Sequence, residues 1–430
     1  MARIPPVCHN AAVKDPRGST STALITAVAS FATYFCMYAF RKPFAVATFD
    51  GLSIGETEYK IALLISQVAG YTLSKFLGIR AVSGLHASKR ISWLIALVVS
   101  AEIALLLFGV VPAPYNFLCL FLNGLPLGMV WGIVFSFVEG RRYTEMIGAG
   151  LCASFVVSSG AVKSVGSWLM DSHGVSEFWM PAATGALFLP PFLVSVYALS
   201  RVPAAETGDV DSRSARPPMT SEERRELVRQ FGFGIFFLVV TYAVLNTYRD
   251  LRDNFAAELW SALGHAKKPE LFTLSELPIA ILVLIISSAL VLERDNRRAF
   301  WYSVASVFVG AGVVLTSTLA FRADALSGAL WMVAVGFGLY LPYIAFHVAV
   351  YERFLAIVHT AGNVGFLMYL SDSLGYTGSV GVMLYKNFAQ PDLTWLEFFV
   401  ATSYAIASLT TILGLFAVLY FRARLPRSTA

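Results

Sequence analysis

The sequence predicts an all-α membrane protein with twelve transmembrane helices arranged as two six-helix halves. Of its 430 residues, 57% are hydrophobic and only 14% are charged, whereas soluble domains have about 25% charged residues. This length accommodates about a dozen apolar helices of ~20 residues with short loops. The composition excludes the disordered, fibrous and disulfide-rich classes of protein.

Twelve apolar segments form the predicted spans. They cover residues 21–49, 60–79, 91–111, 116–138, 145–169, 178–199, 232–253, 271–292, 299–320, 327–351, 357–386 and 396–421. A polar stretch divides the chain into an N-terminal half (1–200), a linker (201–230) and a C-terminal half (231–430). Within the linker, Ser221 to Arg229 is expected to form a short surface helix.

The distribution of basic residues predicts how the spans are oriented. With the N-terminus inside, 22 of the 32 Lys and Arg residues fall in inner segments, which favours cytoplasmic termini. We therefore expect a monomer in the inner or plasma membrane that contacts lipid and no nucleic acid. A twelve-span channel, receptor or lipid-processing enzyme would give a similar profile.

The first span carries basic residues, although a charge at mid-bilayer costs at least ~2.5 kcal/mol on insertion scales. Tyr34, Tyr38 and Arg41 are spaced so that a continuous helix places them on one face. The planar guanidinium of Arg41 suits phosphate or carboxylate, while Lys42 points about 100° away. Either Arg41 and Lys42 mark the outer end of the span, or Arg41 lines a cavity. The apolar residues Phe44–Phe49, which continue the predicted helix, favour the cavity.

The seventh span repeats this pattern. Tyr242, Asn246, Arg249 and Asp253 fall on one helix face, with Arg252 close to it. A neutralised helix end in an outer loop is the alternative interpretation. Since both halves place an arginine in their first span, the two could clamp a divalent anion where the halves meet. Whether Arg249 or Arg252 is the second clamp residue stays open.

Two lysines lie within other predicted spans. Lys75 follows Tyr71 by one helical turn, so it faces the cavity or extends to the cytoplasmic surface. Lys163 lies among small residues of the fifth span. It is a substrate contact, one half of an ion pair with Asp372 or Glu276, or a surface residue, because a lone buried ammonium is costly.

Three carboxylic acids also lie within spans. Glu276 and Asp372 are expected to pair with basic residues, because an unpaired buried carboxylate stays protonated. Glu102 has no evident partner in the sequence. The sequence has no clustered His and Cys residues, no G-x-S-x-G and no phosphate-binding loop. We therefore expect no metal, no cofactor, no catalytic residues and no enzyme activity.

Motifs in four spans resemble those of one known family. The first span contains Tyr34-x-x-x-Tyr38-x-x-Arg41-Lys42-x-Phe44-Ala45, and the second contains Tyr71-Thr72-Leu73-Ser74-Lys75-Phe76. Later motifs are Gly336-Phe337-x-x-Tyr340-x-Pro342, Thr360-Ala361-Gly362, Gly365 and Tyr369-Leu370. Together they resemble the organophosphate:phosphate antiporters, a branch of the major facilitator superfamily. The Phe-Arg-Lys-Pro-Phe string also resembles a set of uncharacterised facilitator-like bacterial membrane proteins.

This resemblance implies roles for several residues. Arg41 and Arg249 would grip the phosphate, and Asp253 and Glu276 would balance the cavity charge, with Asp372 as a further balancing carboxylate. The cavity would be lined by Tyr34, Tyr38, Lys42, Tyr71, Lys75, Tyr340 and Tyr369. This chain departs from the family at two lining positions: Ser159, followed by Lys163, stands near a family histidine, and Asn246 replaces an aromatic residue.

The sequence thus predicts a secondary active transporter that moves a small organic anion by alternating access. A phosphate ester exchanged for inorganic phosphate is the expected substrate. We also expect that two unoccupied arginines repel each other across the interface, which would make exchange obligatory. The alternatives are a non-transporting anion sensor on the same fold and a polytopic lipid-handling enzyme.

Overall fold

The computed structural model describes residues 16–83, 85–138, 144–202, 221–358, 364–390 and 392–425. The helices of the N-terminal half are α1 (Pro16–Met37), α2 (Tyr59–Ser83), α3 (Arg90–Val110), α4 (Phe117–Val138), α5 (Thr144–His173) and α6 (Met180–Ser200). Shorter elements are the 3₁₀ turns η1 (Tyr38–Phe40), η2 (Pro43–Val46) and η3 (Ala87–Lys89), and a hairpin of β1 (Ser53–Ile54) and β2 (Thr57–Glu58).

The C-terminal half continues with α8 (Ser221–Asn254), α9 (Ala256–Ala262), α10 (Glu270–Leu292), α11 (Asn296–Arg322), α12 (Gly328–Ala345), the π-helical η4 (Phe346–Val350), α13 (Tyr351–Ile357), α14 (Val364–Ala389) and α15 (Trp395–Arg424). Across the described ranges, twelve helices have 18 or more residues. Among the described residues, nine helical segments are long and apolar enough to cross a membrane. The described parts of α1, α5 and α14 do not meet that criterion, and all three helices border the site described below.

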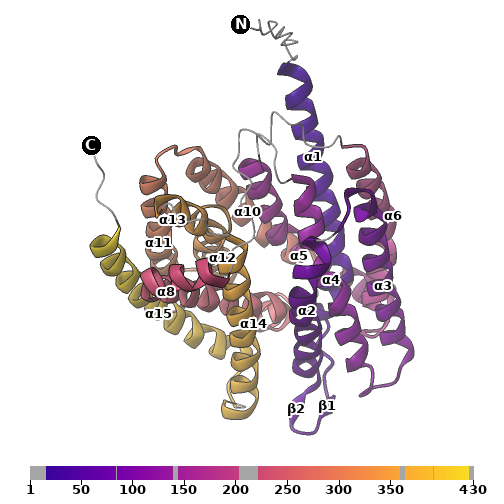
Figure 1. Cartoon of the computed structure of the whole chain (residues 1–430). Coiled ribbons are helices and arrows are strands. Elements are labelled where there is room, and N and C mark those ends of the chain that lie inside the picture. The colour runs from indigo at the N-terminus through magenta and orange to yellow at the C-terminus, as the bar shows by residue number, and fades with distance from the viewer. Residues whose placement is uncertain are drawn as a thin grey trace, which may run out of the picture.

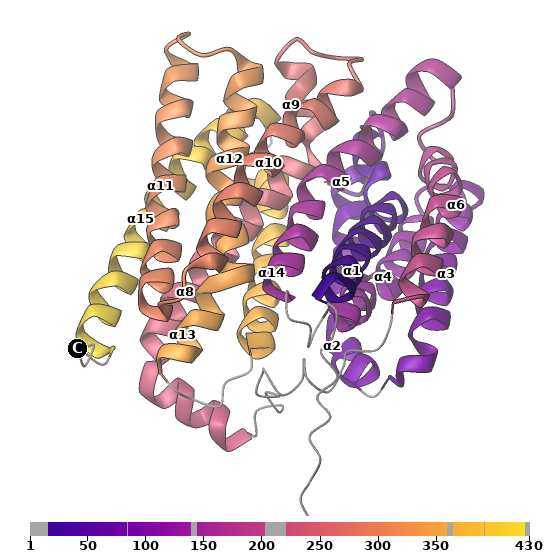
Figure 2. The same cartoon turned by 90° about the horizontal axis from the view of Figure 1, so that it is seen from above.

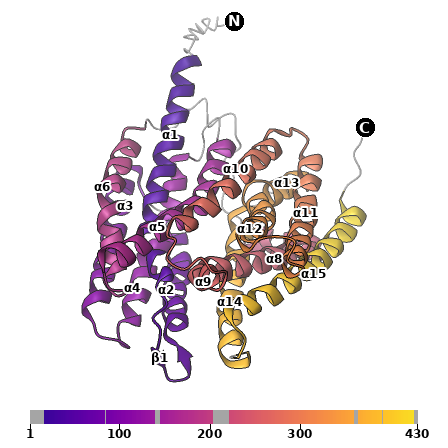
Figure 3. The ribbon, with the colours of Figure 1, turned by 180° about the vertical axis from the view of Figure 1, so that it is seen from behind.

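The helices form two groups that stand side by side. Helices α1–α6 pack on one side and α8–α15 on the other (Figure 1). The groups meet where α5 packs against α10 and α2 packs against α14 (Figure 2). The start of α1 and the end of α15 lie at one end of the bundle, the termini end, and the β1–β2 hairpin lies at the opposite, hairpin end (Figure 3). The predicted class, an all-α membrane protein with two six-helix halves, is confirmed.

The α5–α10 contact depends on a glycine. A Cβ at Gly160 would lie 2.1 Å from the backbone oxygen of Phe272, so any side chain there would separate the helices. Ser164, one turn further along α5, bonds to Pro269 O at 2.6 Å and contacts Thr273 at 2.7 Å. Small residues let membrane helices approach closely and hydrogen-bond. The two halves are therefore in direct backbone contact beside the site.

The first span is broken, which corrects the prediction of one helix from residue 21 to 49. Helix α1 ends at Met37, and two 3₁₀ turns follow. Pro43 contributes to the break, because proline has no backbone N–H to donate to the carbonyl group one turn earlier. Tyr34, Tyr38 and Arg41 therefore do not share the face of a continuous helix, and Arg41 lies in the turn after η1.

The break leaves backbone carbonyls that need hydrogen-bond partners. Gln67 of α2 donates to the Arg41 oxygen at 2.9 Å and to Asn123 Oδ1 at 2.8 Å. Asn123 of α4 in turn donates to the oxygens of Phe40 at 2.9 Å and Ala101 at 3.0 Å. Both amide side chains are buried. They hold the turn that presents Arg41.

Two further expectations about helix boundaries are wrong. Ser221–Arg229 does not form a separate surface helix, because it is the first part of the continuous 34-residue α8. The tenth span extends beyond residue 351 through η4 and α13 to Ile357. Such π-helical turns often occur at functional sites, and η4 contains His347.

The hairpin end also connects the two halves. Asn387 of α14 accepts from the Glu58 backbone N–H at 3.0 Å and donates to the Glu56 oxygen at 2.9 Å. Lys60 of α2 forms an ion pair of 2.5 Å with Glu258 of α9. The Lys60 side chain is only 3% exposed. These contacts bridge the halves at the hairpin end.

Candidate functional site

The turn after η1 presents a buried cation at the junction of the two halves. Arg41 is 6% exposed, and its guanidinium carbon lies 3.8 Å from the centre of the Tyr71 ring. Within the part of the chain that the structure describes, it forms no ion pair, and its Nε has no hydrogen-bond partner. Tyr376 of α14 contacts Tyr71 at 5.5 Å between ring centres. Arg41 is therefore desolvated but lacks a carboxylate.

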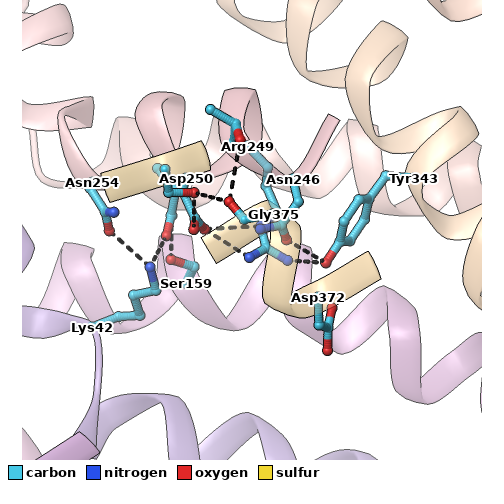
Figure 4. A network of polar contacts seen from close by, with 12 residues as sticks. Lys42, Ser159, Asn246, Arg249, Asp250, Asn254, Tyr343, Asp372 and Gly375 are labelled. Carbon is cyan, nitrogen blue, oxygen red and sulfur yellow. Dashed lines mark hydrogen bonds and ion pairs between the residues drawn. The ribbon is translucent and has the colours of Figure 1, made fainter. Parts of the chain in front are cut away.

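The arginine of the seventh span has a different environment. Arg249 forms an ion pair of 2.7 Å with Asp250 and donates a hydrogen bond to the Tyr343 hydroxyl (Figure 4). Its guanidinium carbon lies 4.8 Å from the centre of the Tyr343 ring. Asp250 also accepts from Ser379 at 2.8 Å. Arg249 is thus neutralised by its neighbour in sequence, and its side chain remains 14% exposed.

Asp253 of α8 binds two lysines of the N-terminal half. Its Oδ2 lies 2.6 Å from Lys42 Nζ, and its Oδ1 lies 2.5 Å from Lys163 Nζ. Ser159 donates to the same carboxylate at 2.5 Å, and Lys42 also donates to Asn254 Oδ1 at 2.9 Å (Figure 4). The expected partners of Lys163, Asp372 or Glu276, are therefore wrong. The correct partner lies across the interface, which sequence spacing does not reveal.

Two further ion pairs lie beside these groups. Arg252 pairs with Glu276 at 2.6 Å and donates to Met332 O at 3.1 Å. Lys75 pairs with Asp372 at 2.8 Å, and Tyr242 donates to the same carboxylate at 2.6 Å. The Arg252 side chain is 3% exposed and that of Arg249 is 14% exposed, so Arg249 is the more accessible of these two arginines.

The remaining predicted residues surround these groups. Tyr34 is buried and packs edge-on against Tyr38 at 5.6 Å between ring centres. Tyr340 is 3% exposed and lies 6.2 Å from the Tyr343 ring. Asn246 accepts from the Tyr343 hydroxyl at 3.4 Å, and its Nδ2 is buried without a partner.

Tyr369 differs from the other predicted lining residues, because it is 36% exposed. The Thr360-Ala361-Gly362 motif lies outside the described residues.

The charges are divided unequally between the halves. The N-terminal half contributes the cations Arg41, Lys42, Lys75 and Lys163, whereas the C-terminal half contributes Arg249, Arg252, Asp250, Asp253, Glu276 and Asp372. We call these ten residues the central charge layer. Counted as ionised, it has six cations and four carboxylates, which leaves a surplus of two positive charges. A buried surplus of this kind is costly unless an anion neutralises it.

Ion pairs add attraction between the halves. Asp253 and Asp372 of the C-terminal half bridge to lysines of the N-terminal half. These bridges form because all four carboxylates of the central charge layer stand on α8, α10 and α14. The expected repulsion between Arg41 and Arg249 stays a prediction.

The sequence analysis did not predict three residues of the site. Asp250 was not among the predicted site residues, although its position next to Arg249 was a signal for pairing. Tyr376 follows Asp372 by four residues and Tyr343 follows Tyr340 by three, so helical spacing marked both. Among the described residues, no group of three or more His, Cys, Asp and Glu side chains could hold a metal ion.

The fold is similar to that of several solved membrane transporters. A bacterial homologue of the human lysosomal transporter Spinster has 13% identity and a TM-score of 0.62, with 97% of this chain and 100% of that chain covered. The nucleoside transporter NupG has 13% identity and a TM-score of 0.61, covering 93% and 99%. A D-xylose–proton symporter has 13% identity and a TM-score of 0.58, covering 95% and 98%. At such identities the similarity establishes the fold alone.

The sequence itself identifies the family. The chain belongs to the family of unknown function DUF5690, whose profile matches residues 43–424. No curated protein matches the sequence significantly. The matched region begins at Pro43, so it excludes Arg41 and Lys42.

Proposed function

We propose that this protein is a secondary active transporter that moves a small organic anion across the membrane by alternating access. The observation that carries the proposal is Arg41, a buried guanidinium at the junction of the halves that has no carboxylate partner among the described residues. Buried polar groups normally have partners, and an exception points to a ligand. In facilitator folds the substrate site lies between the halves near the bilayer midplane.

The expected substrate is a phosphate ester that exchanges for inorganic phosphate. The surplus of two positive charges in the central charge layer matches a dianion. The guanidinium of Arg41 offers paired N–H groups that fit two phosphate oxygens. Tyr34, Tyr38 and Tyr71 lie near enough to interact electrostatically with Arg41, and their hydroxyls are further donors. The motif resemblance to the organophosphate:phosphate antiporters supports the same choice.

The ion pairs suggest how an anion drives the conformational change. Lys42, Lys75 and Lys163 reach across the interface to Asp253 and Asp372. A dianion bound at Arg41 competes with those carboxylates for the lysines. The bridges between the halves then weaken in the loaded state and re-form when the site empties. Differential binding of this kind shifts the equilibrium between inward- and outward-open states.

Arg249 is the expected second contact. Tyr38 and Tyr71 interact electrostatically with both Arg41 and Arg249. The two guanidinium groups therefore approach the same phenols from opposite halves. We further propose that the protein resides in the inner or plasma membrane with both termini in the cytoplasm, following the excess of basic residues on that side.

Uptake into proteoliposomes tests the function. Purified protein is reconstituted in vesicles preloaded with inorganic phosphate, and entry of labelled phosphate and labelled phosphorylated or carboxylated metabolites is measured. Exchange that requires an internal anion supports the proposal. Protein-free vesicles are the control. Binding in a thermal-shift screen without any uptake would favour the sensor, and chemical conversion of a lipid would favour the enzyme, which the transporter neighbours do not support.

A further inference from the structure

We infer that Glu102 of α3 is a proton-binding site, and that its protonation is coupled to anion binding at Arg41. Glu102 is 8% exposed. Among the described residues, it is the one buried carboxylic acid of the N-terminal half. It is also the one buried carboxylic acid outside the central charge layer, because Asp250 belongs to that layer. The coupling depends on the proposed function, whereas the proton site does not.

The surroundings of Glu102 favour the neutral acid. Its Oε2 is buried without a hydrogen-bond partner, and no ion pair involves it in the described residues. A carboxylate in that state would lack both solvation and a counter-charge. Binding a proton removes the charge without any structural change. An intramembrane ionisable residue of this kind is by default a functional site.

The fold makes room for this side chain. A Cβ at Gly185 of α6 would lie 2.0 Å from Glu102 Oε2, so a larger residue there would displace the carboxyl group. The same Cβ would lie 3.1 Å from the Phe40 side chain. Glu102 is therefore enclosed between α3, α6 and the first turn after the break in α1.

Among the described residues, no ion pair connects Glu102 to a neighbouring element. Helix α3 packs against α4, α6, η1 and η3. Their titratable side chains within the described residues are Cys119, Tyr197, Tyr38 and Lys89. None of them forms an ion pair with Glu102, and its buried Oε2 accepts no hydrogen bond from them. Within the described residues, Glu102 therefore has no counter-charge beside it.

A hydrogen-bonded connection joins this site to Arg41. Asn123 donates one hydrogen bond to the oxygen of Ala101, the residue before Glu102, and another to the oxygen of Phe40, the residue before Arg41. Gln67 adds a bond to the Arg41 oxygen. A shift of α3 on ionisation of Glu102 is therefore transmitted to the turn that presents Arg41.

The sign of the coupling follows from charge. A bound anion adds negative charge to the N-terminal half and disfavours a second negative charge on Glu102. Anion binding therefore favours protonation, and by reciprocity protonation favours anion binding. Over the pH range in which Glu102 titrates, anion binding is consequently accompanied by fractional proton uptake. At the lower end of measured couplings, the expected effect is about fivefold in affinity.

Infrared spectroscopy tests the proton site without any substrate. Detergent-purified wild-type protein at neutral pH should show the C=O band of a buried protonated carboxyl group. That band should be missing from Glu102→Gln, a substitution that resembles the protonated acid in shape. Glu270→Gln, at an exposed position on α10, is the matched control and should retain it. Should the variant fold poorly, a pH titration of the wild-type band gives the same answer. A wild-type spectrum without the band would overturn the proposal.

Binding of inorganic phosphate tests the coupling. Its affinity is measured by calorimetry across the pH range in which the infrared band titrates. Phosphate itself titrates, but equally for both proteins, so the difference between wild type and Glu102→Gln isolates Glu102. The wild type should lose about fivefold more affinity than the variant as pH rises. Identical profiles would refute the coupling. Absence of binding to the wild type would contradict the proposed function instead, while the infrared band still decides the proton site.

Discussion

The first helices of the two halves carry equivalent arginines in opposite environments. Arg41 lies in a turn beyond the end of α1, held by backbone contacts to Gln67, and has no carboxylate partner. Arg249 lies within the unbroken α8 and is neutralised by Asp250. A broken helix offers freed backbone groups and close access to a ligand, as in other transporters. The comparison supports the proposal that the N-terminal half supplies the primary anion contact.

The largest expected effect comes from Arg41→Lys. Lysine keeps the positive charge but loses the planar fork and the stacking on Tyr71. We expect a loss of about 3 kcal/mol, within the range for losing one partner of a buried charge pair, or roughly 100-fold in anion affinity. Calorimetry with inorganic phosphate and uptake in proteoliposomes measure it. Expression and melting temperature serve as controls for folding, and transport at the wild-type rate would show that Arg41 is not the anion contact.

A smaller loss is expected for Arg249→Lys, because Asp250 already neutralises this arginine. We expect roughly tenfold weaker anion binding, or about 1.4 kcal/mol. Arg252→Lys is the matched control on the same helix, since Arg252 is engaged by Glu276 and should affect stability more than affinity. An effect confined to Arg252→Lys would mean that Arg252 is the second contact.

Removing the carboxylate of Asp250 tests whether Arg249 can be made to resemble Arg41. Asp250→Asn leaves Arg249 without its ion pair, as Arg41 is now, while the amide can still contact Ser379. The surplus charge of the central charge layer rises by one, so we expect about fivefold tighter binding of a dianion, a gain of about 1 kcal/mol. The same titration calorimetry detects it. Weaker binding in this variant would indicate that Asp250 positions Arg249 rather than masking it.

The fold could be predicted from the sequence because the membrane imposes few solutions. Apolar runs of about 20 residues must be helical to satisfy their backbone groups, and one polar linker separates them into two sets. The break in α1 was missed because residues 44–49 are as apolar as a helix would be. Pro43 marked the break, but a proline is tolerated in many membrane helices.

The sequence predicted most residues of the candidate site, but not which of them contact one another. Rare intramembrane charges marked the ionisable residues of the central charge layer apart from Asp250. Their partners depend on which helices meet across the interface, and a single sequence contains no measure of that. Lys163 shows this limit, because its partner Asp253 lies 90 residues away in the other half.

Lys163 distinguishes the contribution of overall charge from that of direct contact. Lys163→Met lowers the surplus charge by one, while Asp253 keeps its ion pair with Lys42. Stability should therefore fall by less than the ~3–5 kcal/mol typical of breaking a buried pair. We expect about threefold weaker anion binding, or about 0.7 kcal/mol, and a larger loss for substrates that carry an additional carboxylate. Calorimetry and melting temperatures on one preparation give both values.

The double variant Lys163→Met/Asp253→Asn restores the surplus charge, because one cation and one carboxylate are removed together. If net charge governs binding, its affinity should return to the wild-type value. If Lys163 contacts the substrate, the loss should persist in the double variant. Non-additivity of the two changes measures their coupling directly.

The smallest expected effect concerns Gln67, which supports the turn that presents Arg41. Within the described residues, Arg249 has no corresponding support. Gln67→Met removes two hydrogen bonds, one to the Arg41 oxygen and one to Asn123, while nearly preserving side-chain volume. Leaving a buried carbonyl unsatisfied costs about 1–3 kcal/mol of stability. The helical carbonyls around Arg249 need no such support, so the change should weaken Arg41 alone. In the wild-type background, we expect Gln67→Met to weaken phosphate binding roughly twofold. In the Arg41→Lys background, the same substitution should cause no further loss of affinity. Equal losses in both backgrounds would show that Gln67 stabilises the helix bundle in general and does not position Arg41.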